Sequence, residues 1–153
     1  MATHQLDLIR WFAGEITEVH KREARRINRE LENFTVPDSE VVSFQLAGGG
    51  IGVITTSCAL VNGGGQGRFE LLLEGHLLLK HGDPPRLLPE GAGEIPMSAE
   101  PVPSIDAAFV DAVRRRDLSP IRSPYADALK TAAVTIAANQ SAREGRPVPV
   151  PRV

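Results

Sequence analysis

The residues best suited to chemistry lie at the amino terminus, where His4 is followed by Asp7 and then by Arg10. Residues three positions apart share one face of a helix, so the imidazole, carboxylate and guanidinium would form a row. An imidazole beside a carboxylate is a common arrangement for moving a proton to or from a substrate. The spacing therefore fits an acid/base site, in which Asp7 would orient His4 or pair with Arg10. The spacing alone fits as well a helix face in which His4 is only a polar residue near the terminus and Asp7 and Arg10 form an ordinary surface pair.

A short amphipathic helix is needed to hold these three residues. Thr3 is a good N-cap, and Gly14 suits the left-handed conformation that follows a last helical turn. Between them, apolar residues recur at helical spacing. These apolar positions are Leu6, Leu8, Ile9, Phe12 and Ala13. The sequence thus predicts one helix ending at Gly14, with its apolar stripe facing a core.

The middle of the chain predicts β-strands. Apolar and polar residues alternate in 41–47, and runs rich in Val, Ile, Thr and Leu are separated by glycine-rich turns at 48–50 and 62–67. The expected strands are 15–22, 41–47, 51–60, 68–74, 76–80 and 86–88. The segment 21–32 fits either a helix or a strand running into a charged loop. Short strands in direct succession favour an antiparallel meander.

Two helices are predicted near the carboxyl end. Ser104 caps the first, which ends in three arginines at 114–116. The second has Ser123 as its N-cap, Pro124 at its first position and Gly145 at its end. The tail 146–153 would be an edge strand or a loose end. Each helix has one apolar stripe, so the predicted fold is α+β: an open, mostly antiparallel sheet with helices on one face.

Composition and motifs exclude several functions. The chain has 153 residues, a net charge of −2 and one cysteine, so neither nucleic acid nor a disulfide framework is indicated. No apolar run is long enough to span a membrane, and a cytoplasmic location is expected. Cys58 is expected to be buried and inert. Both glycine clusters lead into strands, whereas a phosphate-binding loop must lead into a helix. Neither a cofactor site nor a metal site is therefore expected.

The pattern H-x-x-D-x-x-R-W-x-x-G, from His4 to Gly14, resembles the motif that opens the second domain of the Gfo/Idh/MocA family. Members are NAD(P)-dependent oxidoreductases acting mostly on sugars, polyols and related compounds. The segments S-I-D-A-A-F-V-D-A-V-R and A-D-A-L-K-T-A-A-V-T-I-A-A-N-Q-S-A-R extend the resemblance. It implies that residues 1–153 form a single domain like the family's C-terminal domain. The N-terminal Rossmann domain, with G-x-G-x-x-G and the E-K-P lysine, is absent.

The resemblance also implies roles for the three residues. His4 would be the acid/base of the complete enzyme, with Asp7 orienting it and Arg10 binding substrate. NAD or NADP would be bound by the missing Rossmann domain and not by this chain, which is expected to be inactive alone. The domain would supply substrate contacts and a homo-oligomer interface on the open sheet face. The alternative is a free-standing, non-catalytic module for dimerisation or small-ligand binding.

Overall fold

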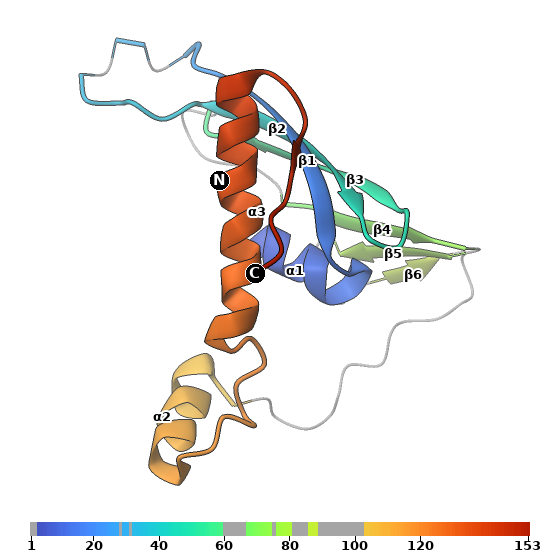
Figure 1. Ribbon diagram of the computed structural model, residues 1–153, viewed down its shortest axis with the longest axis vertical. Coiled ribbons are helices and arrows are strands. Elements are labelled where there is room, and N and C mark those ends of the chain that lie inside the picture. Colours follow the sequence, from blue (N-terminus) through green and yellow to red (C-terminus); the bar gives the residue numbers. More distant parts are fainter. Residues whose placement is uncertain are drawn as a thin grey trace.

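The computed structural model describes residues 3–27, 29–30, 32–59, 67–74, 76–80, 86–88 and 103–153, and it has the predicted α+β class (Figure 1). Helices and strands follow one another in the expected order. In chain order these are α1 (Thr3–Ala13), β1 (Ile16–Ala24), β2 (Ser39–Leu46), β3 (Ile51–Ser57), β4 (Phe69–Leu73), β5 (His76–Lys80), β6 (Arg86–Leu88), α2 (Ile105–Arg115), α3 (Tyr125–Glu144) and β7 (Val148–Pro149).

The strands form two antiparallel ladders. The larger has the order β3-β2-β1-β7, and the smaller has the order β4-β5-β6. The carboxyl-terminal tail is therefore an edge strand, because Val148 pairs with Val19 of β1. The smaller sheet adjoins the core through Phe69 of β4, whose ring lies 5.9 Å from that of Phe12.

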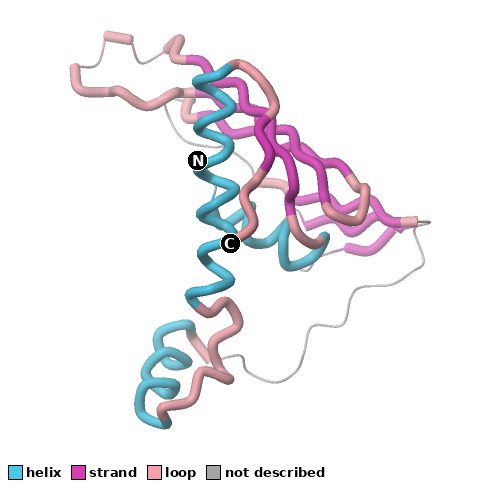
Figure 2. Tube along the Cα trace, viewed as in Figure 1, coloured by secondary structure: helices cyan, strands magenta, loops and turns pink. Residues whose placement is uncertain are grey.

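One face of the larger sheet carries the helices, as predicted, but the helices that cover it are α1 and α3 (Figure 2). The expectation that both carboxyl-terminal helices cover the sheet was wrong for α2. The connection 116–124 brings the chain from α2 directly to the first turn of α3, so α2 lies beyond the sheet. Phe109 and Val113 of α2 are therefore more than 60% exposed. The core contains residues from both ends of the chain. It comprises Leu6, Ile9, Ile16, Val19, Val42, Phe44, Val134, Ala137, Ala138 and Val148.

Two local features fit β1 and β3 to this core. The pairing shifts between Ile16 and Glu18, so Ile16 and Val19 both face inward although they are three residues apart. Gly52 of β3 lies opposite Phe44 of β2. A Cβ there would lie 2.2 Å from the Phe44 ring, so this glycine makes room for the phenyl group.

The turns and helix ends follow the predictions with small corrections. Gly14, Gly49 and Gly145 have positive φ, at the end of α1, in the β2–β3 hairpin and at the end of α3. Thr3 is already helical and is not the N-cap. Pro124, not Ser123, is the N-cap residue of α3, and it makes no side-chain cap bond. The Ser123 hydroxyl instead donates to the Asp127 carboxylate.

Two further expectations concern the strand ends. The ambiguous segment 21–32 continues β1 to Ala24 and then becomes a loop. Cys58, expected to be buried, is exposed because β3 ends at Ser57 and the chain leaves the sheet there. Most of the second glycine-rich turn lies outside the described residues. In the described ranges, no helix is long and apolar enough to cross a membrane.

Candidate functional site

The three predicted residues occupy different environments on α1. Leu6 and Ile9 are buried and pack α1 against α3, which places His4 on the exposed side of the first turn. Asp7 is partly exposed, with 42% of its side chain accessible. Arg10 is buried. The motif therefore begins at the surface and continues into the interior.

Arg10 joins three separate elements. Its Nε and Nη2 atoms donate to the two carboxylate oxygens of Glu15 at 3.0 and 3.1 Å, and Nη2 also donates to Asp127 Oδ1 at 2.7 Å. Nη1 donates to the Asp127 carbonyl at 3.1 Å and to Thr131 Oγ1 at 2.6 Å. These bonds use all five N–H groups of the guanidinium. Arg10 thus fixes α1 to the start of β1 and to the first turns of α3.

Asp7 belongs to the same network. Its Oδ1 accepts a hydrogen bond from Thr131 Oγ1 at 2.8 Å and lies 3.7 Å from Nη1 of Arg10. Of the two alternatives for Asp7, pairing with Arg10 is observed. The carboxylate remains one turn from His4 on the same helix face.

The charges in the network stabilise one another. The hydrogen bond to Glu15 is the largest cause that raises the pKa of Arg10, and the bonds to Asp127 add to it against the effect of burial. The hydrogen bond from Arg10 lowers the pKa of Glu15, and the bond from Lys130 contributes too. The pKa of Asp127 is lowered first by Arg10 and then by Ser123. Asp127 also lies in the first turn of α3, where the helix dipole favours a negative charge.

The sequence interpretation missed Glu15, Asp127 and Thr131. A signal was present, since Asp127 and Thr131 are polar residues at i and i+4 on a predicted helix whose neighbouring positions are mostly alanine. What the spacing did not reveal is their partner, which lies 117 residues earlier than Asp127. The assignment of Arg10 to substrate binding stays a prediction, and its contacts favour a role in holding α1 in place.

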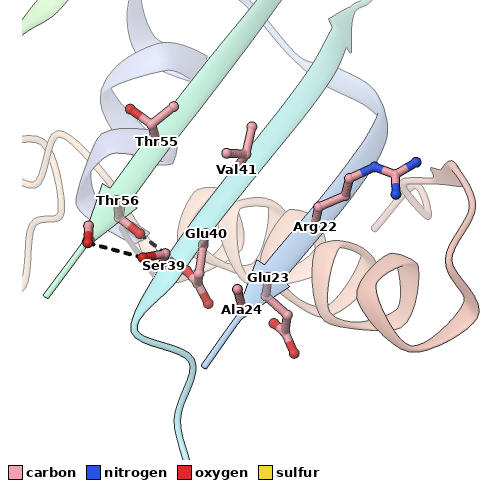
Figure 3. Close-up of a pocket in the computed structure, with 9 residues that line it drawn as sticks. Arg22, Glu23, Ala24, Ser39, Glu40, Val41, Thr55 and Thr56 are labelled. Atoms are coloured by element: carbon pink, nitrogen blue, oxygen red, sulfur yellow. Dashed lines mark hydrogen bonds between the residues drawn. The ribbon is translucent and has the colours of Figure 1, made fainter. Parts of the chain in front are cut away.

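A shallow recess of about 370 Å³ lies at the ends of β1, β2 and β3 and contains none of the three motif residues (Figure 3). Its polar side chains already bind one another. The Thr56 hydroxyl donates to Glu40 at 3.4 Å, and the hydroxyls of Ser39 and Ser57 are 3.2 Å apart. Beneath it, Glu40 and Glu23 pair with the buried Lys21 at 2.7 and 2.8 Å. These contacts are those of a closed sheet end, not of a catalytic cluster.

The described residues do not fit a dinucleotide or a metal ion. The cluster at 48–50 forms the hairpin between β2 and β3, where the next element is a strand and offers no helix N-terminus to a phosphate. Within the described ranges, no group of three or more His, Cys, Asp and Glu side chains is placed to hold a metal.

Comparison with known families agrees with the motif on α1. Residues 1–75 match the family model described as the GFO/IDH/MocA C-terminal domain. This segment of the chain therefore belongs to the Gfo/Idh/MocA C-terminal domain family. The matched segment runs from the motif helix through β4. No curated protein matches the chain significantly.

Solved structures extend the similarity of fold over nearly the whole of this chain. The WlbA dehydrogenase from Bordetella pertussis, in complex with NADH and UDP-GlcNAcA, is 22% identical with a TM-score of 0.73, over 99% of this chain and 44% of that one. Levoglucosan dehydrogenase, in complex with NADH and levoglucosan, is 18% identical with a TM-score of 0.78, over 100% and 50%. An oxidoreductase domain protein from Kribbella flavida is 20% identical with a TM-score of 0.74, over 99% and 50%. The chain spans about half the length of these proteins.

Proposed function

We propose that this chain is the substrate-facing and oligomer-forming half of an NAD(P)-dependent oxidoreductase that acts on a sugar, a polyol or a related compound. The observation that carries the proposal is the motif helix. Its first turn presents His4 to solvent, while Asp7 and Arg10 are anchored to α3. Two of the structurally similar proteins are dehydrogenases in complex with NADH and a sugar compound.

In this proposal a residue of this chain transfers the proton of the reaction, and the hydride transfer takes place outside this chain. The described residues do not fit a dinucleotide, so the redox chemistry would come from a nucleotide-binding domain outside this chain. His4 would take up or return the proton of the substrate hydroxyl, which requires an exposed imidazole on a rigid element. The helix α1 meets that requirement, because its opposite face is buried against the core.

The proposal is tested in the complete protein by H4A, with Q5A as the control on the adjacent exposed position. Loss of the acid/base group should lower kcat by roughly 10²–10⁴-fold and leave nicotinamide affinity nearly unchanged. Q5A should retain activity. Full activity of H4A with a normal pH profile would show that His4 is not the acid/base.

The second candidate is a free-standing module for dimerisation or small-ligand binding. The exposed face of the larger sheet favours it, since an interface there needs no cofactor. The gene sequence immediately upstream separates the two. An in-frame segment with G-x-G-x-x-G and E-K-P supports the oxidoreductase, and its absence supports the module.

A further inference from the structure

An apolar groove lies where α2 meets the first turn of α3. Its volume is about 680 Å³, and Phe109 and Val113 of α2 and Tyr125 of α3 belong to its lining. All three side chains are exposed, and Tyr125 has 86% of its surface in contact with solvent. Ala112, which also lines the groove, is buried. The exposed apolar residues are therefore gathered in one hollow, as at an interaction site, and are not scattered over the surface.

The groove continues as an apolar stripe along the outer side of α3. Tyr125, Leu129 and Ile136 are separated by four and then seven residues, so they lie on one face of the helix. All three are exposed. The opposite face of α3 is buried in the core through Val134 and Ala138. A helix that is apolar on all sides is normally buried on all sides. The composition of α3 therefore indicates a second partner on its outer side.

Positive charge borders the groove. Arg116 belongs to the lining, and Arg122 lies between two lining residues in the connection to α3. Within the described part of the chain, neither arginine forms an ion pair, whereas Arg115 pairs with Asp111 at 2.8 Å. Charges at the rim of an interface favour a partner of opposite charge. The surface therefore fits an apolar face that is bordered by carboxylates.

The lengths of the matched structures indicate where such a partner would come from. The matches cover 99% or 100% of this chain, so they include α2 and α3, but only 44% or 50% of the matched proteins. A domain that precedes α1 in a longer protein would enter beside α3, because Asp7 and Arg10 of α1 both bond to Thr131. A second copy of this chain is expected elsewhere, on the uncovered face of the sheet.

We propose that the groove between α2 and α3, together with the stripe along α3, is the docking surface for the nucleotide-binding domain of the same enzyme. That domain would present an apolar face bordered by acidic side chains. This inference rests on the proposed function, in which the nucleotide-binding domain lies outside this chain. It also gives a reason for the position of α2, which lies beyond the sheet and covers neither of its faces (Figure 1).

Hydroxyl-radical footprinting of this chain and of the complete protein tests the docking surface. Tyr125 is the only tyrosine of the chain, so its oxidation is assigned without ambiguity. Oxidation of Tyr125 should be severalfold slower in the complete protein than in the chain alone, because the core of an interface excludes water. Ile27, in the loop after β1, is also exposed and should react equally in both proteins.

Two variants of α2 carry the same substitution on different faces. Val113 lines the groove, whereas the exposed Val110 is not one of the lining residues. Lysine is a good helix former, so V113K and V110K should both fold. In the complete protein, V113K should raise the oxidation of Tyr125 toward the rate in the isolated chain, and V110K should keep the protection. If V113K does not fold, R116E reverses the charge at the rim and should also reduce the protection.

The proposal is overturned if Tyr125 is oxidised equally in the two proteins, or if V110K removes the protection as fully as V113K. Protection of Tyr125 in the isolated chain at rising protein concentration would overturn it too, because a second copy would then occupy the groove. So would a complete protein without a nucleotide-binding domain. The footprint needs no enzymatic activity. An active H4A enzyme would therefore refute the catalytic role of His4 without deciding where the two domains meet.

Discussion

At the scale of the residue, one arginine connects the predicted chemistry to the fold. Arg10 belongs to the same sequence pattern as His4 and Asp7, yet its guanidinium is buried and bonded to Glu15, Asp127 and Thr131. A buried guanidinium is stable only when its donors are satisfied, and here all five are. One short motif can therefore combine a residue proposed to react with a residue that holds the helix in place.

The pH dependence of stability tests this network. Arg10 lowers the pKa values of Glu15 and Asp127 in the folded protein. Carboxylates with a lowered folded pKa contribute stability that is present above their unfolded pKa, about 4, and is lost as the pH falls through the folded pKa. The thermal midpoint of the wild type should therefore fall as the pH drops below about 4.

The variant E15Q isolates the contribution of Glu15. It should have a lower midpoint than the wild type at pH 7 and a weaker dependence on pH below 4, because one of the two shifted carboxylates is gone. E30Q, in the exposed loop after β1, is the control and should follow the wild-type curve. Parallel curves for E15Q and wild type would contradict the proposed linkage.

At the scale of the element, α3 joins the two ends of the chain. Near its carboxyl end, the fully buried Ser141 hydroxyl accepts from the Lys21 backbone N–H at 3.0 Å and donates to the Arg146 carbonyl at 2.6 Å. One side chain thus bonds β1 and the segment leading to β7. Near its amino end, Asp127 and Thr131 bind α1. The helix fixes the sheet and the motif helix relative to one another.

The substitution S141A should therefore lower the free energy of unfolding, although it removes only one oxygen atom. It leaves the Lys21 N–H and the Arg146 carbonyl without their partner, and an unsatisfied buried polar group costs about 1–3 kcal/mol. Urea unfolding should show a loss of this size. S43A is the matched control, because Ser43 is exposed on the opposite face of the same sheet, and it should change stability by less than about 0.5 kcal/mol.

How far the sequence predicts these elements depends on the range of the interactions involved. The alternation around Val42 and Phe44 identified β2 and its buried face, because burial on a strand has a period of two. The inward placement of both Ile16 and Val19 was not predicted, since it depends on a local shift in pairing with β2. The partners of Arg10 were missed for a similar reason: a local pattern does not show which distant helix will pack there.

At the scale of the whole molecule, the sheet has one covered and one uncovered face. The uncovered face carries Val41, Ser43 and Gln45 of β2, and the adjacent strand β3 adds Ile51 and Val53, which are 82% and 61% exposed. Glu18, His20 and Arg22 of β1 lie on the same face, because they pair with Gln45, Ser43 and Val41. The face is therefore mixed, with its apolar part on β2 and β3. The expected homo-oligomer through this face stays a prediction.

Sedimentation of V53K tests self-association. The wild type should form a dimer or tetramer at micromolar concentration, because exposed apolar residues on a flat sheet are readily buried against a second copy. A lysine at this position, in the apolar part of the face, should shift the population to monomer. V36K makes the same change at a loop residue that is 55% exposed and should leave the assembly unchanged. A monomeric wild type would refute the interface.

The pairing of β7 with β1 has a consequence for biosynthesis. The core consists of residues up to Ile54, a contribution from Phe69, and then residues from Val134 onward. A ribosome adds about 5–20 residues per second, so β1 and its hydrophobic partners emerge several seconds before α3 and β7 can cover them. During that interval α1 is available to cover the inner face of the sheet, but α3 has not yet been synthesised. We therefore expect this domain to complete folding only after translation of its carboxyl end, with the nascent chain depending on chaperones until then.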